Sequence, residues 1–233
     1  MFASTQIKSS YLRIAGVLAL ISALALTIAD YLLEFSPEFR ISNTIIEPFW
    51  LSAAPWRFSI SIFLAAFFLP FYIGGYWLVY RAVRPSHPKI AMTIFLMGSY
   101  GIIMGSPIVH TVLSLFPVLY QSAQAYPQEV VTFAEHLITD QLFTIIMPMF
   151  IIHYFLAFII PPLLFFGVVI GGKSLYPRWT AFLNPFFIAI LLIIGLSIWP
   201  EAFMYLTPGS INKGMIVFFL LPTILLWNGE REI

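Results

Sequence analysis

The chain has no cysteine among its 233 residues, and charged residues make up only 9% of it. The absence of thiols excludes thiolate metal sites, disulfides, redox dithiols and c-type haem attachment. The scarcity of charge excludes an ordinary soluble domain, in which about 25% of residues are charged. A net charge of +1 gives no electrostatic basis for binding nucleic acid.

Long apolar runs take up most of the chain, which is 61% hydrophobic and has a mean hydropathy of +0.95. A helix needs ~20 apolar residues to cross the ~30 Å hydrocarbon layer of a bilayer. The sequence therefore predicts an all-α fold, a polytopic transmembrane helical bundle that forms one domain over residues 1–233. The six predicted spans are about 14–33, 58–80, 90–119, 139–172, 181–199 and 211–227. The fourth is too long for an untilted crossing, so we expect it to begin in the interface, tilt, or break at Pro161–Pro162.

Basic residues predict the orientation of the bundle. Eight of the 11 Lys and Arg residues flank the chain ends or the loops after the second and fourth spans, and three fall on the opposite side. Because cytoplasmic loops carry an excess of Lys and Arg, both termini are expected in the cytoplasm. The expected location is a bacterial inner membrane, with the lipid bilayer as the main partner.

The first and third predicted spans each carry a polar stripe. Asp30 lies late in the first span, where an ionisable group calls for a partner or a function. The third span places Ser106 and His110 four residues apart, on one helical face. A separate face of the same span carries Gly101 and Gly105, whose spacing is typical of close helix packing and could support an oligomer.

Three further ionisable groups lie in and around the fourth span. His136 and Asp140 are one helical turn apart, so they could share a metal or relay a proton, or form a surface ion pair. His153 lies 13 residues beyond Asp140, on nearly the opposite helical face, and is expected to look toward another helix. His110 and His153 are candidate metal ligands, and as a pair they could hold a single haem.

Arg57, Asn212 and Lys213 are the candidate substrate-binding groups near the outer surface. The two cations could hold an anionic head group, although a lysine at this depth can also snorkel to the interface. Most of the ionisable residues in the spans lie in the outer half of the predicted bundle. If they converge, they form a cavity that opens outward.

Several short motifs together resemble those of a family of uncharacterised bacterial multi-pass membrane proteins. They are the late Asp of the first span, the glycine-rich third span ending in a His, Tyr176-Pro177-Arg178-Trp179, Asn184-Pro185 and Asn212. The resemblance implies a helical membrane bundle and no known activity. The alkaline-ceramidase-like hydrolases share membrane-embedded His, Asp and Ser groups, but this chain lacks their paired histidines on a late helix.

Four functions are compatible with these patterns. An intramembrane enzyme acting on a lipid or another apolar small molecule would use His110 as base or metal ligand, with Asp30 and Ser106 as its partners. A proton-coupled carrier would use Asp30 and His110 as proton-binding groups. A structural or assembly subunit would need none of these roles, and a single-haem carrier would need His110 and His153. The sequence does not identify a cofactor.

Overall fold

A computed structural model describes residues 8–36, 45–172 and 174–229, with only the backbone described at 106–109. Within these ranges every regular element is a helix, which confirms the all-α class. The α-helices are α1 (Ser9–Glu34), α2 (Trp56–Phe68), α3 (Tyr72–Val83), α4 (Pro88–Ala123), α5 (Gln128–His136), α6 (Phe143–Tyr154), α7 (Ile160–Ile170), α8 (Pro185–Ile198), α9 (Pro200–Phe203) and α10 (Ser210–Leu225). Shorter turns join them: the 3-10 turns η1 (Pro48–Leu51), η2 (Leu69–Phe71) and η5 (Arg178–Phe182), and the π turns η3 (Leu137–Leu142) and η4 (Phe155–Ile159).

Four continuous helical stretches in the described part of the chain are long and apolar enough to cross a membrane. They are α1, Trp56–Val83, α4 and Gln128–Ile170. Two shorter apolar helices, α8 and α10, have 14 and 16 residues. These helices make the protein compatible with an integral membrane location, while the count of six crossings and the side of the termini stay predictions.

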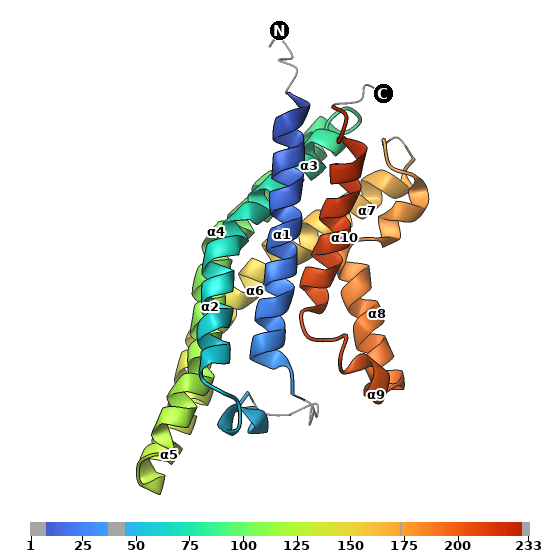
Figure 1. The fold of residues 1–233 in the computed structure, drawn as a ribbon. Helices are drawn as coiled ribbons and strands as arrows, with labels where there is room; N and C mark the ends of the chain where they lie inside the picture. Colours follow the sequence, from blue (N-terminus) through green and yellow to red (C-terminus); the bar gives the residue numbers. More distant parts are fainter. Residues whose placement is uncertain (1–7, 37–44, 173, 230–233) are drawn as a thin grey trace.

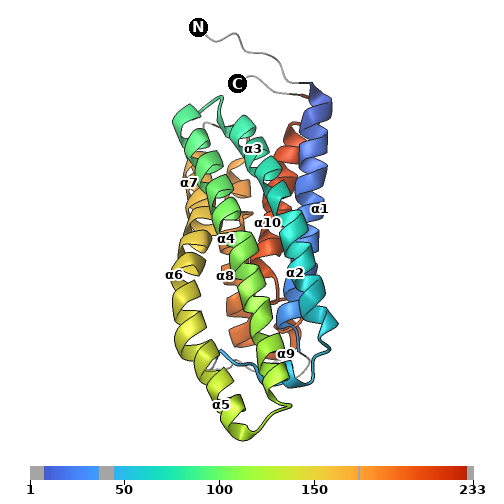
Figure 2. The same cartoon turned by 90° about the vertical axis from the view of Figure 1, so that its left-hand side faces the viewer.

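The long helices run side by side along one axis (Figures 1 and 2). α1 begins and α10 ends at the same end of the bundle, where Nε of Arg13 donates to the carbonyl of Trp227 at 2.7 Å. We call this the tail end, and we call the opposite end, which carries η1, α5 and α9, the loop end. α1 packs against α2, α3 and α10, and α4 packs against α2, α3, α6 and α7.

The helical stretch through Pro161 and Pro162 does not break there. Proline lacks the N–H that a helix interior needs, and both prolines occupy the first turn of α7, directly after the π turn η4. The wider hydrogen-bonding loop of a π turn inserts one extra residue without ending the helix. Within η4 the carbonyl of Ala157 accepts a hydrogen bond from the hydroxyl of Tyr76 on α3.

Asn184 starts α8 at the point where the chain turns back into the bundle. Its fully buried side chain accepts from the backbone N–H groups of Phe186 and Phe187 at 3.1 and 3.3 Å. Its amide donates to the carbonyl of Ala181 at 2.7 Å. The Asn-Pro motif at 184–185 is therefore a helix cap, a role for which Asn is among the preferred residues.

The glycine face of α4 is covered within the chain. A Cβ added at Gly101 would lie 2.7 Å from the backbone N of Ala157, and one at Gly105 would overlap the Cβ of His153. These glycines let α4 approach α6 and η4 closely. The face that the sequence offered for an oligomer contact is thus occupied by helices of the same molecule, and an oligomer would have to use another surface.

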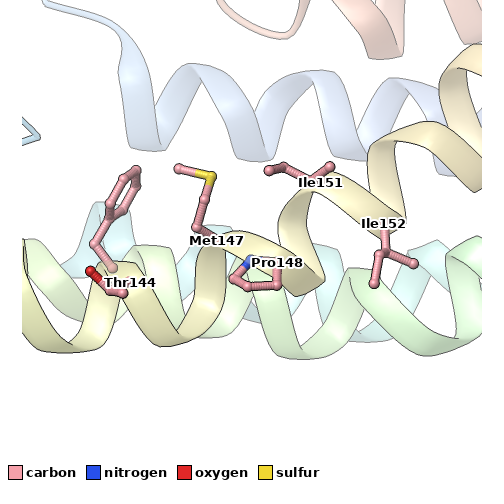
Figure 3. Close-up of a pocket in the computed structure, with 6 residues that line it drawn as sticks. Thr144, Met147, Pro148, Ile151 and Ile152 are labelled. Atoms are coloured by element: carbon pink, nitrogen blue, oxygen red, sulfur yellow. The ribbon is translucent and has the colours of Figure 1, made fainter.

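The opposite side of α6 forms a smooth apolar surface. Figure 3 shows Thr144, Met147, Pro148, Ile151 and Ile152 around a shallow hollow on this helix. Ile151 and Ile152 expose 47% and 43% of their surface. No ionisable side chain of the described residues lines this hollow, so it is the kind of surface that a membrane helix presents to lipid.

Candidate functional site

Asp30 and His110 meet between α1 and α4. Nε2 of His110 lies 3.3 Å from Oδ1 of Asp30, and the two side chains are only 14% and 15% exposed. Nδ1 of His110 lies 3.5 Å from the hydroxyl of Ser114, one helical turn along α4. With the proton on Nε2, the ring donates to the carboxylate and its Nδ1 accepts from the serine. Both ring nitrogens therefore have a partner.

Asn212 holds the other oxygen of the same carboxylate. Its side-chain amide, at the start of α10, donates to Oδ2 of Asp30 at 2.6 Å. Its carbonyl oxygen accepts a hydrogen bond from the hydroxyl of Tyr72, which begins α3 and is fully buried. The contacts of Asp30 thus join four helices, α1, α3, α4 and α10, and fix the orientation of the carboxylate.

These groups line a cavity of about 190 Å³ inside the bundle. Apolar and aromatic side chains form most of its walls, with Glu34 as a second carboxylate and His153 as a second imidazole. The polar lining residues are Asp30, Glu34, His110, His153, Tyr154 and Asn212. We call this space the inner cavity.

His153 faces α4, as the sequence predicts. It is 5% exposed, and its Nδ1 lies 2.9 Å from the carbonyl of Gly101. The glycines of α4 make this contact possible because they bring the two backbones close together. His153 shares the inner cavity with His110, so two of the four histidines converge there.

Glu34 stands one helical turn beyond Asp30 on α1, at the mouth of the inner cavity. Its Oε2 lies 3.4 Å from the backbone N–H of Gly209, which precedes α10. Gly209 has φ of 65°, and a Cβ there would lie 3.3 Å from Oδ2 of Asp30. A glycine is suited to this position because the backbone is left-handed and passes close to a carboxylate. The start of α10, the positive end of its dipole, lies beside both acids.

A second cavity of about 270 Å³ lies beside η1 at the loop end. We call it the outer cavity; Leu33, Glu34 and Leu113 line both spaces. Its other lining residues include Glu47, Phe49, Trp50, Phe116 and Thr207. Because three residues are shared, the two cavities adjoin and lead from the loop end toward Asp30.

Buried aromatic rings close the inner cavity toward the tail end. Tyr72 and Phe219 have ring centroids 5.1 Å apart, and Tyr76 and Phe219 have theirs 5.5 Å apart. All three side chains are fully buried, as is Phe218. The polar lining groups of the two cavities thus lie on the loop-end side, and buried aromatic packing follows them along α3 and α10.

The two cations expected to bind a substrate do not line either cavity. Arg57 donates to the carbonyls of Leu32 and Phe35 at 3.1 and 2.6 Å, and so caps the end of α1. Lys213 donates to the carbonyls of Leu206 and Pro208 at 2.5 and 2.9 Å. Of the three residues assigned to substrate binding, the structure brings only Asn212 to the Asp30–His110 pair.

His136 and Asp140 form a separate pair near the loop end. Nδ1 of His136 lies 2.7 Å from Oδ2 of Asp140, and the side chains are 70% and 63% exposed. The described residues contain no group of three or more His, Asp or Glu side chains arranged to hold a metal ion. The four residues predicted as metal ligands therefore lie in two places, the inner cavity and this surface.

The side chain of Ser106 lies outside the described residues, so its place relative to His110 is not part of this site. Ser114 supplies the hydroxyl beside His110, but it is fully buried and does not line the inner cavity. Sequence reasoning missed Tyr72 and Tyr154. The signal for Tyr72 was a phenol in mid-span, four residues before Tyr76 on the same helical face.

The fold and the inner cavity define a class: a bundle of apolar helices, compatible with an integral membrane location, that encloses a carboxylate–imidazole pair. The chain belongs to a family described as of unknown function, DUF6796, which matches residues 6–228. This match agrees with the resemblance to an uncharacterised family. No curated protein and no solved structure matches the chain.

Proposed function

We propose that this protein is a proton-coupled carrier, in which Asp30 and His110 bind and release the coupling proton. The contact between these two side chains, inside a bundle of apolar helices, carries the proposal. Ionisable groups at membrane depth cost several kcal/mol unless paired, and in membrane proteins they commonly mark proton or substrate pathways. A carboxylate in direct contact with an imidazole gives the site two groups that can bind a proton.

The surroundings of the pair support proton exchange with the loop end. A proton entering through the outer cavity meets Glu34 first and then the Asp30–His110 pair, because Glu34 lines both cavities. The hydrogen bond from Asn212 keeps the Asp30 carboxylate in place. We take the loop end to face outward, since α1 begins, α3 ends and α4 begins at the tail end, and Arg13, Arg84 and Lys89 lie in or beside these helix ends. The proposal also includes six crossings of a bacterial inner membrane, with both termini in the cytoplasm.

The enzyme hypothesis has less support from the geometry. Hydrolysis of a lipid would call for a reactive group that meets the substrate, and the described hydroxyl beside His110, that of Ser114, is buried away from the cavity. Binding of an anionic head group would call for a free cation, and Arg57 and Lys213 direct their donors to backbone carbonyls. Single-haem binding would require one nitrogen of His110 to give up its present partner, Asp30 or Ser114, in order to ligate iron.

The test is a pH jump on proteoliposomes adsorbed to a solid-supported membrane. The wild-type protein should give a transient displacement of positive charge when the outer solution is acidified. His110→Ala and Asp30→Asn should remove the transient, while both variants stay inserted and elute as folded protein. His136→Ala is the matched control, because its imidazole pairs with an aspartate at the exposed surface. Transients of wild-type size in both cavity variants would overturn the proposal.

An absorption spectrum and a metal analysis of the same purified samples test the remaining alternatives. A Soret band that disappears in His110→Ala or His153→Ala would replace the carrier proposal by the haem hypothesis. Stoichiometric zinc or iron without that band would replace the carrier proposal by the metalloenzyme hypothesis.

A further inference from the structure

The outer cavity combines aromatic walls with carboxylate groups. Its walls are apolar and aromatic, with Phe49, Trp50 and Phe116 among the lining side chains. Among the described residues, its ionisable lining groups are the carboxylates of Glu34 and Glu47. A space with aromatic faces and negative charge attracts a cation that carries apolar groups, because the ring faces and the carboxylates both favour positive charge.

The charge in this cavity is not neutralised by an ion pair in the described part of the chain. Arg57 does not line the cavity. Its guanidinium lies 5.7 Å from the centre of the Phe49 ring and donates to carbonyls at the end of α1. Lys213 acts electrostatically on Glu34, but its Nζ is held by the carbonyls of Leu206 and Pro208 and the hydroxyl of Tyr31. The backbone N–H of Gly209 is the group that donates to Glu34.

The shape of the cavity limits the size of its ligand. A volume of about 270 Å³ lies just below the range of typical drug-binding pockets, about 300–1,000 Å³. It is large enough for one aromatic ring or a short alkyl chain attached to an ammonium group. Trp50, which is 6% exposed, presents a large and rigid wall, because its backbone carbonyl is fixed by the side chain of Gln121 at 2.5 Å.

We propose that the outer cavity binds a small organic cation, an alkyl- or arylammonium compound, between Glu34, Glu47 and the aromatic wall around Trp50. This inference rests on the proposed function, since it makes the cation the solute exchanged against the proton held at Asp30 and His110. Glu34 lines both cavities and is the group through which the solute and the proton would compete.

The test uses the full chain in lipid nanodiscs and tritiated benzyltrimethylammonium as the probe. The wild-type protein should bind the probe saturably. Neopentylbenzene, which has a carbon in place of the nitrogen, should not displace it. Glu34→Gln and Glu47→Gln should each weaken binding roughly tenfold or more, because a charged partner is lost. Trp50→Leu should weaken it roughly fivefold through the lost ring face.

Glu129→Gln is the matched control, since it removes a carboxylate that is exposed on α5 at the same end of the bundle. It should leave binding unchanged. Equal displacement by the neutral compound, or wild-type affinity in both cavity variants, would overturn the inference. A pH-jump transient without saturable binding of the probe would overturn it too, while leaving the proton-binding proposal in place. Saturable, Glu47-dependent binding without the transient would support the cation site and overturn the carrier.

Discussion

Nε2 of His110 lies 3.3 Å from Oδ1 of Asp30, although 80 residues separate them in the chain. Asn212, a further 102 positions beyond His110, donates to the other oxygen of the same carboxylate at 2.6 Å. The site is thus built by long-range packing of α1, α4 and α10. The order of these helices around Asp30 determines which groups can exchange a proton with it.

Removal of the Asn212 side chain should disturb two neighbouring polar groups. In Asn212→Ala, Asp30 loses one donor and the buried hydroxyl of Tyr72 loses its acceptor. An unsatisfied buried polar group costs about 1–3 kcal/mol, so thermal unfolding in detergent should shift downward. Tyr72→Phe in the Asn212→Ala background should cost less than Tyr72→Phe alone, because the partner is already missing. Additive effects of the two changes would contradict the contact.

Arg57 should act on stability rather than on binding. Its donors reach the carbonyls of Tyr31, Leu32 and Phe35 at the end of α1, at 3.3, 3.1 and 2.6 Å. Arg57→Met should therefore lower stability by about 1.5–3 kcal/mol, as expected for hydrogen bonds to a charged donor. Arg57→Lys should recover only part of this loss, since an ammonium lacks the planar fork. A head-group role would instead leave the unfolding temperature of both variants unchanged.

The close contact of α4 with α6 should depend on Gly105. A Cβ there would overlap the Cβ of His153, and neither backbone can withdraw without moving a helix. We expect Gly105→Ala to lower stability by about 1–3 kcal/mol, the usual cost of overpacking. Gly167→Ala is the control, because a Cβ there meets nothing within 4 Å and a helical alanine gains up to ~1 kcal/mol over glycine. Equal thermal shifts in the two variants would contradict this packing.

Glu47 should make stability depend on pH. Burial raises the pKa of its carboxyl above the ordinary value of 4.5. The folded state then binds a proton more tightly than the unfolded state, so the stabilisation is complete below the unfolded pKa and is lost as pH rises through the folded pKa. Glu47→Gln removes this dependence. The wild type should therefore lose thermal stability relative to Glu47→Gln as the pH rises above the ordinary carboxyl pKa of 4.5. A difference that stays constant over this rise in pH would contradict the prediction.

The apolar pattern predicted the helical class because lipid-facing and buried positions in a membrane bundle are both apolar. The same property hides the contacts between helices. Gly101 and Gly105 were recognised as a packing face, but nothing in their spacing says whether the partner is a second copy or α6 of the same chain. The structure shows the latter, through their contacts with Ala157 and His153.

The pairing of Asp30 with His110 followed from their positions late in the first span and in the outer half of the third. Arg57 and Lys213 show the limit of this reasoning. Depth alone suggested two cations in a binding site, whereas both turn to backbone carbonyls at the ends of helices. The hydrogen-bond partners of such a cation depend on which backbone carbonyls are unpaired. Those carbonyls lie at helix ends, which sequence patterns locate only to within a few residues.

The two short apolar helices have a consequence for the surrounding bilayer. At 1.5 Å per residue, α8 and α10 are about 21 and 24 Å long, less than the ~30 Å thickness of hydrocarbon. Hydrophobic mismatch of this kind thins the lipid next to the short segments. The thinned lipid would lie on the side where α10 begins, beside Asp30 and Glu34. Water and lipid head groups would then reach these acids from the side of the bundle. In a membrane of uniform thickness, hydrocarbon would occupy the same depth.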